Sequence, residues 1–163
     1  MNVNECVGFL GHSSSFPLFD SFLANNQIMT RPKGKESYET LKSLDHKTVL
    51  SFQLLADFKE ESLIPVKSEG KSILSEIEVH TGNTGTLPYG LSFKDRVEDI
   101  KKKLNNIFDN VSIPERKILT FHHDSLLISI FFNKNKEIFM IKMFVPSIYD
   151  KKNLGIEINN PAR

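Results

Sequence analysis

TLPYGLSFKDRVEDIKKKLN, residues 86–105, decides the fold, because turn chemistry, a helix start and an apolar stripe agree there. Pro88 and Gly90 predict a turn, since proline fixes φ and glycine permits positive φ. Asp95 and Glu98 have the three-residue spacing of a helical capping box. The apolar residues that follow have helical spacing: Val97, Ile100 and Leu104. The stretch therefore predicts a turn followed by an amphipathic helix.

Three apolar stretches follow this helix. Their alternation predicts antiparallel strands over residues 117–122, 126–132 and 137–145. Short polar loops separate them, and Asn135 suits the left-handed position of a tight turn. The third stretch is apolar on both faces, so we expect it in the centre of a sheet. Residues 150–163 carry few apolar side chains and predict a loose tail.

The first half of the chain repeats this order of elements. An apolar face containing Phe19 and Phe22 predicts a helix that ends at Asn25. A second short helix is predicted over residues 38–45 from the spacing of three apolar residues: Tyr38, Leu41 and Leu44. From Lys47 the apolar period changes to two, which predicts a strand through Phe58, a turn at residues 59–62, and a later strand over residues 73–80.

These elements predict a single α+β domain over residues 1–163, with an antiparallel sheet and helices packed on one face. Two similar halves, each a helix followed by a meander, would occupy residues 1–82 and 86–149. An internal duplication explains this order, and so does a chance likeness between two α+β halves.

Composition restricts the class of protein. The hydrophobic fraction of 39% and the charged fraction of 25% are typical of a folded, water-soluble chain. No apolar run is long enough to span a bilayer, and residues 1–15 lack the features of a secretory signal. Cys6 is the only cysteine, which excludes an intramolecular disulfide and a thiolate metal site. The cytoplasm is therefore the expected compartment, with no membrane partner.

Charge argues against a general nucleic-acid binder. The net charge is only +1, whereas such proteins carry a strong basic excess. The two halves differ, because residues 1–86 contain 8 basic and 11 acidic side chains and residues 87–163 contain 13 and 9. These counts give net charges of −3 and +4, so a basic partner is expected to meet the first half.

Motifs for catalysis and cofactor binding are missing. The five histidines include no HExxH pair, and there is no GxSxG or phosphate-binding glycine loop. We therefore expect no cofactor, no metal and no enzyme activity. The alternative is a small nuclease or hydrolase in which His122 or His123 forms an acid–base pair with Lys117 or Lys142 across a hairpin.

Acidic residues gather around the first predicted hairpin. They are Asp57, Glu60, Glu61, Glu69, Glu76 and Glu78. One interpretation is a solvated edge that prevents strand-to-strand aggregation. The other is a patch complementary to a basic protein, where charge raises the association rate and specificity.

Two motifs carry a family resemblance over about residues 87–144: LPYGLSF followed by DRVEDIKKKL, and the meander LLISIFFNKNKEIFMIKMF. Together they resemble the C-terminal part of small bacterial immunity proteins that neutralise polymorphic or contact-dependent growth-inhibition toxins. In that family an LPxGLxF phrase introduces the helix. Asn105 here replaces the family's glycine, and residues 133–136 replace its Asp/Gly turn. The unit also resembles β-lactamase-inhibitor and outer-membrane assembly-lipoprotein modules, which are exported.

The resemblance implies an intracellular, non-catalytic protein that binds one toxin domain and blocks its active site. Such toxins are commonly nucleases with basic surfaces, so the six acidic residues become the hypothetical toxin-binding site. The expected partner is the C-terminal domain of the cognate toxin, with no nucleic acid bound. A general assembly or adaptor module is a third alternative.

Overall fold

The computed structural model describes residues 1–158 and contains one antiparallel sheet, which confirms the predicted α+β class. The strands are β1 (Tyr38–Lys42), β2 (Thr48–Leu54), β3 (Ser72–His80), β4 (Asp109–Asn110), β5 (Ile118–His123), β6 (Leu126–Phe132) and β7 (Ile138–Phe144). The helices are α1 (Val3–Val7), α2 (Pro17–Asn25), α3 (Leu55–Glu61), the 3₁₀ turn η1 (Pro88–Gly90), α4 (Val97–Leu104) and α5 (Ile148–Leu154).

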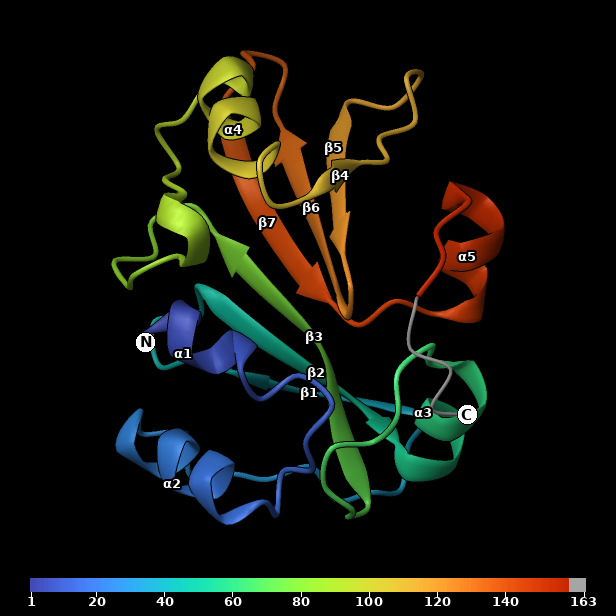
Figure 1. Cartoon of the computed structure of the whole chain (residues 1–163). Coiled ribbons are helices and arrows are strands. Elements are labelled where there is room, and N and C mark those ends of the chain that lie inside the picture. The colour runs from blue at the N-terminus through green and yellow to red at the C-terminus, as the bar shows by residue number, and fades with distance from the viewer. Residues whose placement is uncertain (159–163) are drawn as a thin grey trace.

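The sheet has the strand order β1-β2-β3-β7-β6-β5-β4 (Figure 1). Each half of the chain contributes a meander, β1–β3 from the first and β5–β7 from the second. The two meanders join where their last strands, β3 and β7, pair antiparallel. β7 is therefore central, as its two apolar faces predicted.

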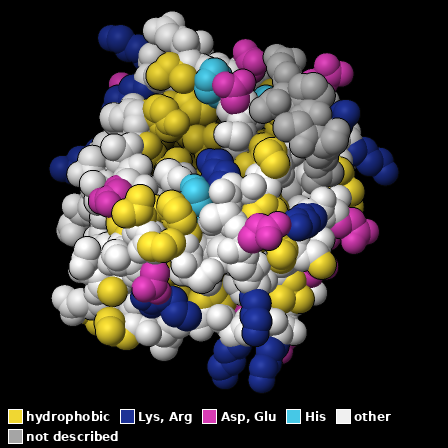
Figure 2. All heavy atoms as spheres, turned by 60° about the horizontal axis from the view of Figure 1, so that its bottom comes forward, with side chains coloured by type: hydrophobic (Ala, Val, Ile, Leu, Met, Phe, Trp, Pro, Cys, Tyr) yellow, Lys and Arg dark blue, Asp and Glu magenta, His cyan; other side chains and the backbone are white. Residues whose placement is uncertain are grey.

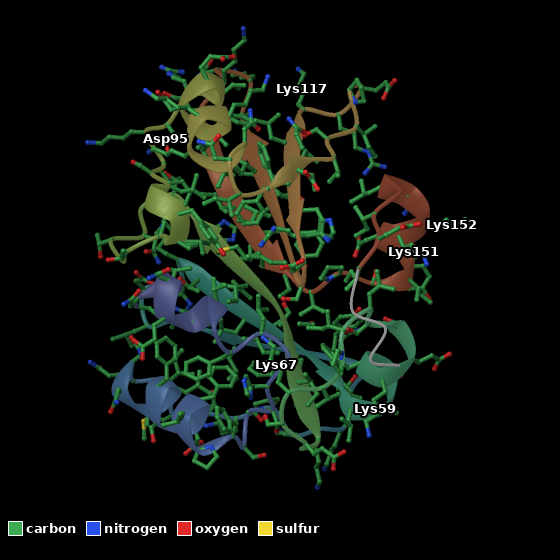
Figure 3. The ribbon with its side chains drawn as sticks, in the orientation of Figure 1. Lys59, Lys67, Asp95, Lys117, Lys151 and Lys152 are labelled. Atoms are coloured by element: carbon green, nitrogen blue, oxygen red, sulfur yellow. The ribbon has the colours of Figure 1, made fainter. Side chains whose placement is uncertain are left out.

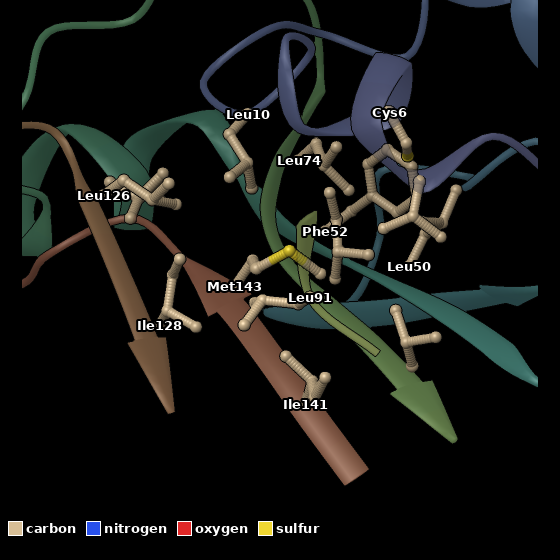
Figure 4. Close-up of a cluster of buried hydrophobic side chains, with 14 of the residues drawn as sticks. Cys6, Leu10, Leu50, Phe52, Leu74, Leu91, Leu126, Ile128, Ile141 and Met143 are labelled. Atoms are coloured by element: carbon tan, nitrogen blue, oxygen red, sulfur yellow. The ribbon is translucent and has the colours of Figure 1, made fainter. Parts of the chain in front are cut away.

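One face of the sheet is the core. The cross-strand register aligns Leu50, Ile77, Met143, Ile128 and Phe121 in a single row, and each of these side chains is completely buried. Helices α1, α2 and α4 cover this face (Figure 1), and Figure 4 shows buried side chains of the core, among them Leu50, Ile128 and Met143. Fully burying an aliphatic or Phe side chain contributes about 1.5–3 kcal/mol, so this row holds the two meanders together.

The helix of the opening stretch forms where predicted, but its cap differs. The Arg96 N–H donates to Asp99 Oδ2 at 2.9 Å, so the cap lies one residue later than expected. Asp95 is instead buried, and both its carboxylate oxygens accept from Lys103 Nζ, at 2.8 and 2.9 Å. The N–H of Ser92 donates to the same carboxylate. Asp95 therefore links the preceding turn to the last turn of α4, by accepting hydrogen bonds from Ser92 and Lys103.

Three predictions in the first half are wrong. Residues 38–42 form the strand β1 instead of a helix, because they pair along their whole length with β2. Only Leu41 of the three supposed helix-face residues is buried, and Leu44 is 70% exposed. The strand predicted through Phe58 ends at Leu54, α3 begins at the next residue, and Phe58 is buried from that helix. The turn predicted at residues 59–62 is wrong for the same reason, because residues 59–61 continue α3.

The predicted loose tail over residues 150–163 is also partly wrong. Residues 148–154 form α5, which begins with a capping box between Ser147 and Asp150. It ends at Gly155, whose φ of +65° is the left-handed conformation that glycine adopts readily. Residues 159–163 of the predicted tail lie outside the described residues.

Candidate functional site

The second face of the sheet carries polar side chains among apolar ones such as Phe131, Phe144 and Leu127. Along one row of the register, Glu78 lies opposite Lys142, which lies opposite Ser129 and then Thr120. Ser51 and Glu76 form the start of the neighbouring row. We call this surface the open face, because α1, α2 and α4 all pack on the other side (Figure 1).

Lys142 lies at the centre of the open face. Its Nζ is 3.5 Å from Glu76 Oε1 and 3.5 Å from Glu78 Oε2. The ring centroid of Phe131 is 5.9 Å away. Glu78 also contacts His80 Nε2 through Oε1 at 2.5 Å. One lysine therefore contacts two carboxylates, which leaves an excess of negative charge on this part of the face.

Helix α5 stands over the open face and leaves a groove of about 400 Å³ beside it. The groove is lined by Tyr38, Ser51, Gln53, Glu61, Ser75, Glu76, Phe144, Val145, Ser147, Tyr149 and Asp150. Three of these residues are acidic, namely Glu61, Glu76 and Asp150, and none is lysine or arginine. We call this hollow the acidic groove.

Tyr38 forms one wall of the acidic groove. Gln53 Nε2 donates to Tyr38 Oη at 3.0 Å and to Glu61 Oε2 at 2.9 Å. The pKa of the Tyr38 phenol is raised above its usual range by burial and then by the negative charges of Glu61, Glu76 and Asp57. The negative charges of carboxylates on α3 and β3 thus add up at the Tyr38 hydroxyl, so the groove favours the binding of a cation.

Exposed tyrosines flank the groove. Tyr38 is 61% exposed and Tyr149 is 57% exposed. Lys151 and Lys152 of α5 are exposed and point away from the sheet (Figure 3), so they do not neutralise the groove. Tyrosine is enriched at protein-binding surfaces.

The structure brings four of the six predicted acidic residues to this region. Glu61 and Glu76 line the groove, Glu78 adjoins Glu76 through Lys142, and the charge of Asp57 acts on Tyr38. The buried Oδ2 of Asp57 has no hydrogen-bond partner within residues 1–158. Glu60 and Glu69 are exposed and do not line the groove, and Glu69 Oε1 is 3.4 Å from Lys59 Nζ.

The histidines of the alternative prediction face opposite sides of β5. His122 is buried, and its Nε2 is 2.9 Å from the carbonyl oxygen of Asp124. His123 is half-exposed, with Nε2 3.3 Å from Asp124 Oδ2. Lys142 already contacts Glu76 and is not in the row of the register that contains His122.

A second hollow of about 410 Å³ lies near Lys67. It is lined mainly by apolar side chains together with Asp124 and Ser125. His12 is close by, its Nδ1 lies 3.0 Å from Ser68 Oγ, and its pKa is lowered by burial and by the charge of Lys67. Figure 2 shows this side of the molecule, where hydrophobic, lysine and histidine side chains lie together.

Neither metal sites nor membrane-spanning segments are found within residues 1–158. No group of three or more histidine, cysteine, aspartate or glutamate side chains there could hold a metal ion. No helix in the same range is long and apolar enough to cross a membrane.

Three other residues that line the acidic groove were not identified from the sequence: Tyr38, Tyr149 and Asp150. The sequence predicts a helix at Tyr38 and a tail from Asp150 onward, and it assigns no element to Tyr149. The Ser147–Asp150 spacing is a capping-box signal that would have predicted α5. No signal in the sequence indicates that α5 lies beside Tyr38.

No protein family and no curated protein sequence matches the chain. A crystal structure of a DUF4309 family protein, YjgB from Bacillus subtilis subsp. subtilis str. 168, is similar with a TM-score of 0.39 and 12% sequence identity. The match covers 78% of this chain and 77% of that chain. At this level of similarity it carries no inference about function.

Proposed function

We propose that the chain is an immunity protein that binds the toxin domain of a polymorphic or contact-dependent growth-inhibition system and blocks its active site. The protein acts in the cytoplasm, without a cofactor and without catalysing a reaction. Its partner is a protein, most simply a nuclease domain whose substrate-binding surface is basic.

The acidic groove is the observation that supports this proposal. Its three carboxylates have no lysine or arginine among the described lining residues, and Lys142 Nζ lies 3.5 Å from Glu76 Oε1. A basic surface docked there would gain charge-assisted hydrogen bonds, which are stronger than neutral ones. Long-range attraction would also speed the encounter between toxin and inhibitor.

The exposed tyrosines supply the apolar part of such an interface. Tyr38 and Tyr149 both line the groove, and each keeps more than half of its surface accessible. Tyrosine is enriched among residues that dominate protein–protein binding energy, because it buries a rigid ring and keeps a hydroxyl for hydrogen bonding. Exposed tyrosines beside carboxylates match lysine or arginine side chains of a partner, through cation–π contacts and ion pairs.

A protection assay tests the proposal. The chain is expressed in a sensitive bacterium together with the toxin domain encoded directly upstream of its own gene. We expect survival, and a stable complex on gel filtration. Cell death without a complex would contradict the proposal, and catalysis by His122 or His123 would be the next activity to assay.

Neighbouring glutamates provide a matched test of the surface. Glu61→Gln keeps the side-chain shape and an acceptor for Gln53 but removes a charge from the groove. Glu60→Gln removes the same charge from an exposed position that does not line it. We expect Glu61→Gln to weaken toxin binding about tenfold and Glu60→Gln to change it less than about twofold. Equal effects would show that the acidic groove is not the contact surface.

A further inference from the structure

Strand β1 is an unpaired edge of the sheet. It is the first strand in the order, and among residues 1–158 it pairs with β2 alone. Tyr38, Thr40 and Lys42 are all exposed. An exposed edge with free backbone groups can pair with a strand from another chain.

The register determines which backbone groups are free. At one end of β1 the Ser37 carbonyl accepts from the Leu54 N–H at 3.3 Å, and at the other the Ser43 N–H donates to the Thr48 carbonyl at 2.9 Å. Bonded residues alternate along an antiparallel strand, so positions 37, 39, 41 and 43 bond to β2. The N–H and C=O groups of the residues between them therefore point outward: Tyr38, Thr40 and Lys42.

These same residues face the acidic groove side of the sheet. Tyr38 is opposite Gln53 and Thr40 is opposite Ser51, and all except Thr40 line the groove. A strand added to β1 would place every second side chain on this open face, about 4.8 Å beyond β1. Tyr38 thus belongs both to the free edge and to the groove wall.

We propose that an extended segment of the partner pairs with β1 as an eighth strand and directs a lysine or arginine over Tyr38 into the acidic groove. This inference rests on the proposed function and specifies how that partner is recognised. Main-chain hydrogen bonds provide the affinity of such strand addition, and alternate side chains provide its specificity. Lys42 at the far end of β1 is a cation, so the segment carries a neutral or acidic residue beside it.

Proline at position 40 is the decisive substitution. Thr40→Pro removes an outward N–H and leaves the hydrogen bonds between β1 and β2 intact, and proline is tolerated on the free side of an edge strand. Thr40→Val retains the N–H and suits a strand, so it is the matched control. Circular dichroism and thermal unfolding check that both variants are folded.

The toxin domain from the protection assay is the probe, and its Kd is measured by calorimetry. We expect Thr40→Pro to weaken binding about 10- to 100-fold and Thr40→Val to change it less than about threefold. Amide hydrogen exchange of the unmutated protein gives a second measurement, in which the Thr40 and Lys42 amides gain protection in the complex.

The outcomes separate the two proposals. If the unmutated chain binds no toxin domain, the proposed function fails and strand addition fails with it. If Thr40→Pro and Thr40→Val bind equally and the Thr40 amide gains no protection, strand addition alone is wrong. A free protein that is dimeric, and that Thr40→Pro makes monomeric, would show that a second copy occupies the edge and would likewise overturn the inference.

Discussion

Replacing Asp95 by asparagine tests whether this carboxylate caps α4 or forms half of a buried ion pair. The Asp95 side chain is 10% exposed, and Lys103 Nζ lies within 2.9 Å of both its oxygens. Asparagine has nearly the same shape and can still accept from the Ser92 N–H. The substitution therefore removes the charge and little else.

The magnitude follows from the contacts that are lost. Two bonds from the Lys103 ammonium to a carboxylate become at most one bond to a neutral amide oxygen, and bonds between charged groups contribute about 1.5–3 kcal/mol. Breaking a fully buried ion pair costs about 3–5 kcal/mol, but the Lys103 side chain is 34% exposed and keeps its bond to the Gly90 carbonyl. We expect Asp95→Asn to lower the free energy of unfolding by about 2 kcal/mol, or Tm by about 4–8 °C.

Urea denaturation measures this change, provided that the slope m stays constant between variants. In a Lys103→Met background the same substitution is expected to cost less than about 1 kcal/mol, because the cation has already been removed. Asp99→Ala should cost about 1 kcal/mol, because it removes the side chain that accepts from the Arg96 N–H at the helix cap. Glu98→Gln, at an exposed position, should cost almost nothing.

A different pattern would refute this reasoning. If Glu98→Gln destabilises α4, and if Asp95→Asn costs the same with and without Lys103, then Asp95 and Glu98 act as the capping box that their spacing predicts. The coupling between positions 95 and 103 therefore separates the structural interpretation from the sequence interpretation.

Two further predictions concern titratable groups in the first half. Burial and Lys67 lower the pKa of His12, so the unfolded chain binds more protons as pH falls below about 6.5, and the free energy of unfolding should decrease from there towards the lowered pKa. His12→Gln should make the free energy of unfolding, measured by urea denaturation, decrease less between pH 7.5 and 5.5. The same decrease in the variant and the unmutated protein would contradict this prediction. Complete burial raises the pKa of the Cys6 thiol, so an aromatic disulfide reagent should label it only after unfolding, whereas rapid labelling of the native protein would show that the site is open.

The second half of the fold could be predicted because its signals are local. Strands β5–β7 are alternating apolar runs separated by short polar loops, and α4 has a strong amphipathic stripe. The cap of α4 was assigned one residue early, because Asp95, Glu98 and Asp99 all fit an acidic first turn. Only the contact with Lys103 distinguishes Asp95 from the others.

The first half could not be predicted in the same way, because tertiary pairing decides it. Tyr38, Leu41 and Leu44 have a spacing that fits a helix, yet pairing with β2 makes residues 38–42 a strand. The alternation of Leu54, Ala56 and Phe58 suggested one long strand, whereas helix formers such as Lys59 and Glu60 continue α3. Short segments carry too few residues for periodicity to separate the two structures.

The candidate site depends even more on the tertiary structure. The register between β2 and β3 shifts between Ser51, which pairs with Glu76, and Phe52, which pairs with Leu74. The residues that line the groove come from both halves of the chain. From the sequence, an acidic surface was predicted in the first half alone, because the net charges of residues 1–86 and 87–163 were compared. Asp150, from the basic half, also lines the groove.

Local charge, and not net charge, therefore decides which partner the chain can bind. A formal charge of +1 gives no preference, yet the fold separates its charges. Lys142 lies between two glutamates, and Lys151 and Lys152 point away from the groove (Figure 3). The charges of Glu61, Glu76 and Asp57 act on Tyr38, so they attract a basic partner docked there over about 10 Å, the screening length at 0.1 M salt. Because attraction at this range weakens as salt is added, the association rate of a basic partner should fall with ionic strength, although the net charge predicts almost no dependence.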